Sequence, residues 1–229
     1  MKIKQELLSL ADPIYRDFEA RLIPSIDKTR IIGVRTPALR ALAKRIFKTE
    51  EAKAFISDLP HEYYEEYNLH AFLIEEIRDF SECRARVLEL LPYVDNWATC
   101  DSLSPRVFFK DECRAELLKL AYELLDSRHV YGIRYGIVIL MKHFLGEKFR
   151  EDQLLRVAAV RSDDYYVKMA VAWYFASALT KQYDSTLRVI QNKVLDPFTH
   201  NKAISKARDS LAIEQEKKNE LKKYIIRRL

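Results

Sequence analysis

Apolar side chains recur at helical spacing along almost the whole chain, and the alternating apolar and polar runs typical of strands are missing. Glycine, which many β-turns require, occurs only four times in 229 residues. A capping residue followed by proline marks helix starts at Asp12-Pro13, Thr36-Pro37 and Asp196-Pro197. The pattern predicts an all-α protein, with helices at 2–11, 13–23, 36–48, 50–58, 62–79, 81–92, 96–104, 110–126, 130–145, 150–161, 163–181, 184–194, 197–212 and 215–228.

The predicted helices form consecutive pairs with short connections, such as 36–48 with 50–58 and 163–181 with 184–194. Such pairs recur at roughly the 30–45-residue period of helical repeats. A pair can bury its apolar stripe only against its neighbours, so we expect a curved solenoid of HEAT-like antiparallel helix pairs with a concave groove. No Gly-, Pro- or Ser-rich linker divides the series. Residues 1–229 are therefore expected to form a single HEAT-like repeat domain.

The segment from Tyr131 to Phe144 is apolar nearly all round, which predicts a buried central helix. Arg134 interrupts this apolar surface, and Lys142 lies a little over two turns further, on about the same side. A buried cation needs an anion. The partner is either an internal carboxylate, the commoner case for a lone arginine, or a phosphate that lies in the groove.

Composition narrows the class of protein further. No apolar run approaches the roughly 20 residues of a membrane span, and the charged N-terminal segment does not resemble a signal peptide, so we expect a cytoplasmic protein. Cys83, Cys100 and Cys113 lack CxxC spacing and are expected to be buried, reduced thiols. The five histidines show no metal-ligand spacing, so we predict no metal and no cofactor.

The formal net charge of +5 is concentrated at the C-terminal end. Residues 197–229 hold nine Lys and Arg against four Asp and Glu, which leaves the rest of the chain balanced. A basic end segment can contact phosphates. It can equally be a solvated helix face, and charge alone favours that interpretation.

The two tryptophans carry the main functional signal. Trp97 lies four residues before Asp101, so the two share one face of a helix, and Trp173 lies in the segment that begins at Tyr165. An indole and a carboxylate presented together favour a substrate that is cationic or becomes so in its transition state. Without further signals, an aspartate one turn after a tryptophan is more often a surface or cap residue beside a core indole.

Taken in order, these residues resemble the AlkD-type DNA glycosylases of the DNA alkylation repair family, helical-repeat proteins that release cationic N3- and N7-alkylpurines. The resemblance covers most of the chain. It depends on Gly33-Val34-Arg35-Thr36-Pro37 with Leu39-Arg40, on Val94-Asp95-Asn96-Trp97 followed by Asp101, on Arg134 in its apolar helix, and on Tyr165-Tyr166-Val167 leading to Trp173.

The resemblance implies that Trp97, Asp101 and Trp173 line a cleft on the concave face and act in catalysis. Asp101 would stabilise the oxocarbenium-like sugar and orient the attacking water, while the indoles pack on the deoxyribose. It also implies that a monomer binds duplex DNA, mainly through the backbone, and leaves the damaged base within the duplex. The implied DNA contacts are Arg134, Lys142 and, on helix 197–212, Lys202, Lys206 and Arg208.

One segment departs from the family pattern. Family glycosylases usually have a helix with basic and aromatic residues just before the Gly-x-x-x-Pro motif, which probes the DNA near the lesion. Here residues 22–32 contain Pro24, which disfavours helix, and no aromatic residue. Two alternatives therefore stand beside the glycosylase hypothesis: a non-enzymatic DNA-binding paralogue, and a repeat-type scaffold whose groove receives an acidic helix or peptide.

Overall fold

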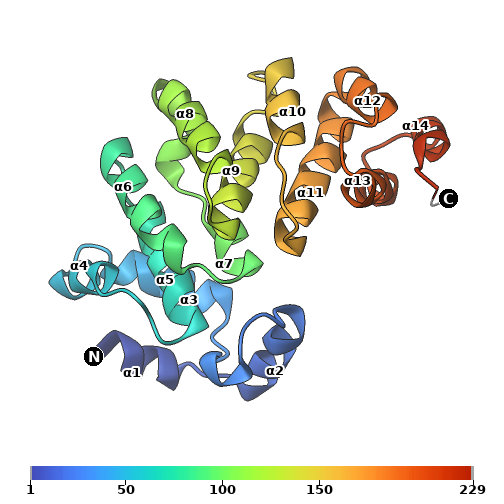
Figure 1. Ribbon diagram of the computed structural model, residues 1–229. Helices are drawn as coiled ribbons and strands as arrows, with labels where there is room; N and C mark the ends of the chain where they lie inside the picture. Colours follow the sequence, from blue (N-terminus) through green and yellow to red (C-terminus); the bar gives the residue numbers. More distant parts are fainter. Residues whose placement is uncertain (1, 228–229) are drawn as a thin grey trace. The chain divides into compact units, whose positions relative to one another are not determined.

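The computed structural model describes residues 2–227, and within them the chain forms fourteen α-helices, five short 3-10 helices and no strand (Figure 1). The predicted all-α class is confirmed. Each predicted helix has a counterpart, although the last one, 215–228, ends at a residue outside the described part of the chain. Contacts divide the chain into two compact units, one that ends at Arg114 and one that begins at Ala115.

The first unit contains the helices α1 to α7. They are α1 (Lys2–Ser9), α2 (Pro13–Leu22), α3 (Thr36–Ile46), α4 (Glu50–Ser57), α5 (Tyr64–Glu75), α6 (Phe80–Leu90) and α7 (Trp97–Ser102), with 3-10 helices η1 (Lys28–Arg30), η2 (Leu91–Tyr93), η3 (Arg106–Phe109) and η4 (Asp111–Cys113).

The second unit contains α8 to α14. Arg114, at the unit boundary, is the first residue of α8. The helices are α8 (Arg114–Leu125), α9 (Val130–His143), α10 (Glu151–Ala158), α11 (Tyr165–Lys181), α12 (Tyr183–Gln191), α13 (Pro197–Asp209) and α14 (Gln215–Leu221), followed by η5 (Lys222–Tyr224). Whether the two units form the single repeat domain expected from the sequence stays a prediction.

Several observed helices are shorter than the predicted ones, because apolar spacing continues through the connections. The predicted helix 81–92 ends as α6 at Leu90, and Leu91–Tyr93 form a 3-10 turn. Pro92 lacks the N–H that an α-helix needs. The predicted helix 110–126 begins as the 3-10 turn η4 before α8.

Helix α5 is the centre of the first unit. Every one of its residues is buried, and it contacts α1, α3, α4, α6 and α7. The carboxylate of Glu65 accepts hydrogen bonds from the backbone N–H groups of Ile32, Gly33 and Val34, at 2.9, 2.6 and 3.2 Å. A buried charge that is satisfied in this way fixes the segment that leads into α3.

Gly33 makes that segment possible. Its φ is +94°, a conformation that side chains disfavour, and a Cβ atom at this position would lie 2.3 Å from the carbonyl oxygen of Asp12. Only glycine fits at the start of the Gly-x-x-x-Pro motif, so that motif reflects a close approach of two backbone segments.

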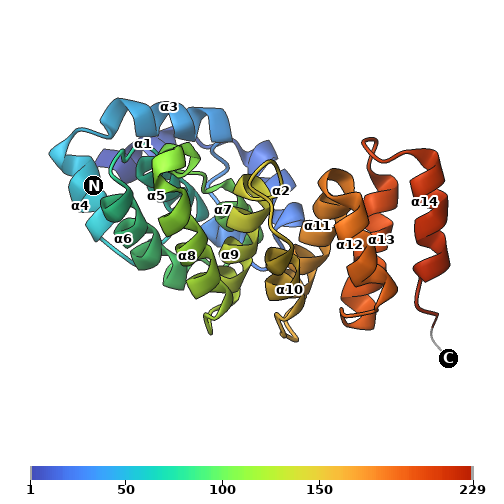
Figure 2. The ribbon, with the colours of Figure 1, turned by 90° about the horizontal axis from the view of Figure 1, so that it is seen from above.

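The second unit is a stack of helix pairs. Helix α11 packs most extensively against α9 and α13, while α10 contacts both α11 and α12. Figure 1 accordingly shows α9, α11 and α13 in one layer and α8, α10 and α12 in another; Figure 2, from above, shows α12 and α13 beside α11. The first residues of α11 and α13 meet, with the rings of Tyr165 and Phe198 6.3 Å apart, so these two helices run parallel.

Two predictions about burial are confirmed. Ten of the residues of α9 are buried, including Arg134, as expected for a central helix. The thiols of Cys83, Cys100 and Cys113 are buried, and burial raises the pKa of Cys83 to about 12. Among the described residues no helix is long and apolar enough to cross a membrane.

Two neutral histidines, the partly buried His61 and the buried His70, contact each other in the first unit. Nε2 of His61 is 2.8 Å from Nδ1 of His70, and the His61 ring stacks on Phe55. Burial lowers the pKa of His61 to about 4 and the pKa of His70 to about 3; Asp58 opposes the first shift, while His61 and Arg86 reinforce the second. Both rings therefore stay neutral in the folded protein at pH values where they would be charged in the unfolded chain.

We expect the free energy of unfolding to fall between pH 7 and pH 5. Over this range the unfolded chain binds protons at His61 and His70 with a pKa near 6.5, whereas the folded protein binds none, so each group costs about 2 kcal/mol at pH 5. Urea denaturation at both pH values measures the loss. His70→Leu should reduce it by about 2 kcal/mol, and an unchanged loss in that variant would contradict the assignment.

Candidate functional site

A buried polar network positions α7. The side chain of Asn96 caps the helix by accepting from the N–H of Thr99 at 2.8 Å, and its Nδ2 donates to Oγ1 of Thr99 at 3.0 Å. Oγ1 of Thr99 in turn donates to Oδ1 of Asn68, on α5, at 2.8 Å. All three side chains are at most 5% exposed. The network therefore ties the N-terminus of α7 to α5 and helps to set the direction of this short helix.

Trp97 and Asp101 lie one turn apart on α7, as the sequence predicted. Both are partly buried, whereas Thr99 and Cys100 between them face the core. The six-residue helix thus presents an indole and a carboxylate on its accessible side. A π face and an anion side by side favour positive charge.

The segment that departs from the family pattern contacts Trp97 directly. Leu22 is the last residue of α2, and after it residues 23–32 form no α-helix but only the 3-10 turn η1. Nε1 of Trp97 donates to the carbonyl oxygen of Leu22 at 3.3 Å, and the indole packs against a cluster that contains Ile23, Ile26 and Ile31.

An ion pair ties the other end of this segment to α7. Nη1 of Arg30 lies 2.9 Å from Oδ2 of Asp95, the residue just before the cap of α7, and Nε of Arg30 donates to the carbonyl oxygen of Glu62. The segment is therefore part of the support of the Trp97 indole, a role that the sequence pattern did not reveal because it depends on contacts between residues about 75 positions apart.

In the second unit, Trp173 lies on the accessible stripe of α11. Tyr166, Met169, Trp173, Ser177 and Thr180 are all half-buried and follow one another at helical spacing. Trp173 lines a pocket of about 360 Å³ between α11 and α13, together with Ala176, Ser177, Thr180, Lys206, Asp209 and Ser210. The structure thus brings together two residues that the sequence singled out, Trp173 and Lys206. Convergence of Trp97 and Asp101 with Trp173 stays a prediction, because they belong to different units.

Of the two cations of α9, Arg134 is buried and Lys142 is exposed. Nη1 of Arg134 donates to the carbonyl oxygen of Tyr166 at 2.8 Å, at the first turn of α11. The guanidinium is thus anchored to the neighbouring helix by a backbone acceptor, a partner that the sequence analysis did not consider. This contact joins α9 to α11 at the first residue of the stripe that carries Trp173.

The three predicted cations of α13 do not share one direction. Lys202 and Lys206 are one turn apart and half-buried, and Lys202 lines a second pocket with Phe198, Asn201 and Ile226. Arg208 is two residues after Lys206, about 200° further around the helix, and its Nε is buried. Lys202 and Lys206 therefore form one edge, and Arg208 points away from it.

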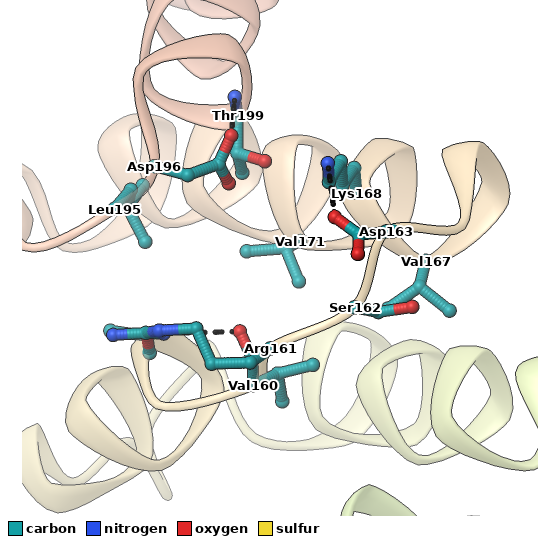
Figure 3. A pocket seen from close by; sticks show the side chains of 11 residues that line it. Val160, Arg161, Ser162, Asp163, Val167, Lys168, Val171, Leu195, Asp196 and Thr199 are labelled. Carbon is teal, nitrogen blue, oxygen red and sulfur yellow. Dashed lines mark hydrogen bonds and ion pairs between the residues drawn. The ribbon is translucent and has the colours of Figure 1, made fainter. Parts of the chain in front are cut away.

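Another pocket of the second unit, of about 300 Å³, lies between the start of α11 and the start of α13 (Figure 3). Its charged groups are engaged by the protein itself. Lys168 pairs with Asp163, Asp196 caps α13 at the N–H of Thr199, and Arg161 donates to the carbonyl oxygens of Ala158 and Val160. The polar groups of this pocket therefore cap helices and close a loop. Unlike the Trp173 pocket, it contains no residue that the sequence analysis singled out as a catalytic or DNA-binding candidate.

Among the described residues, no group of three or more His, Cys, Asp or Glu side chains is placed to hold a metal ion.

Residues 3–207 match the family model described as DNA alkylation repair enzyme. The chain belongs to this family. A search of curated proteins finds no match. The match to the DNA alkylation repair family contains Trp97, Asp101, Arg134, Trp173 and Lys206 and ends just before Arg208. Asp209 and Ser210, which share the pocket of Trp173, lie beyond it.

We expect Thr99→Val to lower the free energy of unfolding by about 1–3 kcal/mol, because the isosteric change leaves the buried polar atoms of Asn68 and Asn96 without their partner. Urea denaturation measures the change. Ser102→Ala is the matched control on the same helix, since Oγ of Ser102 donates only to the carbonyl oxygen of Thr99 and is partly exposed. Equal stability of the two variants would show that the network does not hold α7.

Proposed function

We propose that this protein hydrolyses the N-glycosidic bond of cationic N3- and N7-alkylpurines in duplex DNA. The observation that carries the proposal is the presentation of Trp97 and Asp101 on one turn of α7, held by the buried contacts of Asn68, Asn96 and Thr99, in a member of the DNA alkylation repair family. So rigid a mounting is what transition-state stabilisation by a carboxylate requires.

The cleavage step needs no protonation of the leaving base by the protein. An alkylated purine already carries positive charge, so it leaves as a neutral base with the bonding electron pair when its bond to C1′ breaks. Positive charge then develops on the sugar, and the carboxylate of Asp101 stabilises it and orients the water that adds to C1′. That water gives up a proton, which passes to solvent. Trp97 and Trp173 pack on the deoxyribose and attract its charge.

The DNA contacts follow from three lysines, of which Lys142 is exposed and Lys202 and Lys206 are half-buried. Their ammonium groups contact the phosphate backbone, and Arg134, anchored on Tyr166, supports the stripe of α11. A single copy of the protein binds the duplex mainly through its backbone and leaves the damaged base in the stack.

A second candidate is a DNA-binding family member without excision activity. The observation that favours it is the contact between residues 22–32 and Trp97: the chain's own backbone and the isoleucine cluster occupy one edge of the indole. An indole used in part as a packing surface has less of its face available to the sugar.

We expect Asp101→Asn to lower the rate of 7-methylguanine release from a labelled duplex by at least about 100-fold, because the neutral amide cannot stabilise the developing cation. Single-turnover release of base measures the rate, and Asp58→Asn, which removes an exposed carboxylate after α4, is the control. Salt-dependent binding of DNA without any base release by the unmodified protein would establish the second candidate instead.

A further inference from the structure

The pocket between α11 and α13 contains two opposite charges that do not meet. Lys206 and Asp209 both line it and stand three residues apart on α13. Within the described residues, neither forms an ion pair or a hydrogen bond through its side chain. A cation and an anion that share a pocket without pairing leave both charges available to a ligand.

Opposite charges three residues apart pair at some places in the described chain and stay apart at others, such as Lys148 with Glu151 and Lys181 with Asp184. At the same spacing, Lys53 pairs with Glu50 at 2.7 Å, Arg114 with Asp111 at 2.9 Å and Lys217 with Glu214 at 3.6 Å. Arg86 and Glu89, which follow the same order as Lys206 and Asp209, pair at 2.8 Å. Spacing alone therefore does not decide whether such charges pair.

The position of Asp209 is electrostatically unfavourable for the fold. It is the last residue of α13, where the helix dipole places partial negative charge, and the pocket also lies at the C-terminal half of the parallel helix α11. No backbone or side-chain partner compensates the carboxylate in the described structure. Two helix ends and an unpaired carboxylate give this side of the pocket a preference for positive charge.

The hydroxyl groups give the other side a preference for phosphate. Ser177 makes no hydrogen bond through its side chain within the described residues, and Oγ of Ser210 accepts from the N–H of Ala212, which leaves its own proton to donate. Thr180 is committed to the carbonyl oxygen of Ala176. Two available hydroxyl donors and the ammonium of Lys206 are the groups that backbone phosphates accept from.

We propose that this pocket binds the sugar-phosphate of a nucleotide with a cationic base, and that Asp209 selects for the positive charge. Lys206, Ser177 and Ser210 hold the phosphate, the indole of Trp173 packs on the sugar, and Asp209 attracts the charge that an alkylated purine shares with its sugar. The inference rests on the proposed function for its substrate class. It adds a specificity residue that the family match does not cover.

The test is equilibrium binding to a duplex that holds one 2′-fluorinated 7-methyldeoxyguanosine, whose glycosidic bond resists cleavage, and to the same duplex with unmethylated 2′-fluorodeoxyguanosine. The protein should prefer the methylated duplex. Asp209→Asn should lower this preference about fivefold, as expected for one solvent-accessible charge contact, and should tighten binding to the unmethylated duplex. Lys206→Gln should weaken binding to both duplexes alike and reduce the slope of log affinity against log salt by about 1.

Two matched variants control for net charge. Asp184→Asn and Lys148→Gln change exposed residues of the same unit that line no part of this pocket and form no ion pair within the described chain. If Asp209→Asn keeps the preference at the level of Asp184→Asn, or if Lys206→Gln binds like Lys148→Gln, the proposal is wrong. Because the probe cannot be cleaved, a protein that binds DNA without excision would still show the preference, so this outcome is separate from that of the Asp101→Asn assay.

Discussion

The buried polar face of α5 is the constraint on which the first unit depends. Glu65 holds the backbone of residues 32–34, and Asn68, one turn later, holds Thr99 in α7. One helix therefore fixes both the Gly-x-x-x-Pro segment and the turn that carries Trp97 and Asp101. Such groups are costly to bury, and the cost is offset only when every hydrogen bond is made. Because a missing hydrogen bond would destabilise the fold, these buried groups favour one arrangement of the segments over all others.

Residues 22–32 depart from the family pattern, but the segment still has a structural role, because it supports Trp97. A helix would satisfy its backbone internally, whereas this stretch uses the bond from Trp97 to Leu22, the pair of Arg30 with Asp95 and the cluster of isoleucines. The contacts close around one edge of the indole. The loop therefore limits the surface that the indole presents to a ligand. The position of Trp97 depends on the packing of a segment that lies far from it in sequence.

The sequence predicted the helices, the buried α9 and the pairing of Trp97 with Asp101, because all three depend on periodicity within one element. It missed features that depend on contacts between elements. The buried α5 was expected only as an ordinary paired helix, since its Glu, Asn and His residues hide the apolar pattern. Arg208 was grouped with Lys202 and Lys206 by charge, although two residues along a helix reverse the direction of a side chain. Asp209 was not singled out at all, since its isolation becomes visible only when the pocket beside Trp173 is known.

The charged side chains of the second unit differ in whether they form ion pairs that join neighbouring helices. Arg156 with Asp126 and Arg188 with Glu151 join neighbouring helices at the surface, where such pairs contribute little and mainly fix geometry. Lys206 and Asp209 join nothing within the described structure, and Asp209 opposes the dipole of its own helix. Asp209 is exposed, as is Asp184, which also forms no ion pair within the described residues, so the fold tolerates an unpaired acid at such positions. In the proposed complex, a substrate with positive charge on one side and a phosphate on the other would satisfy Asp209 and Lys206 at the same time.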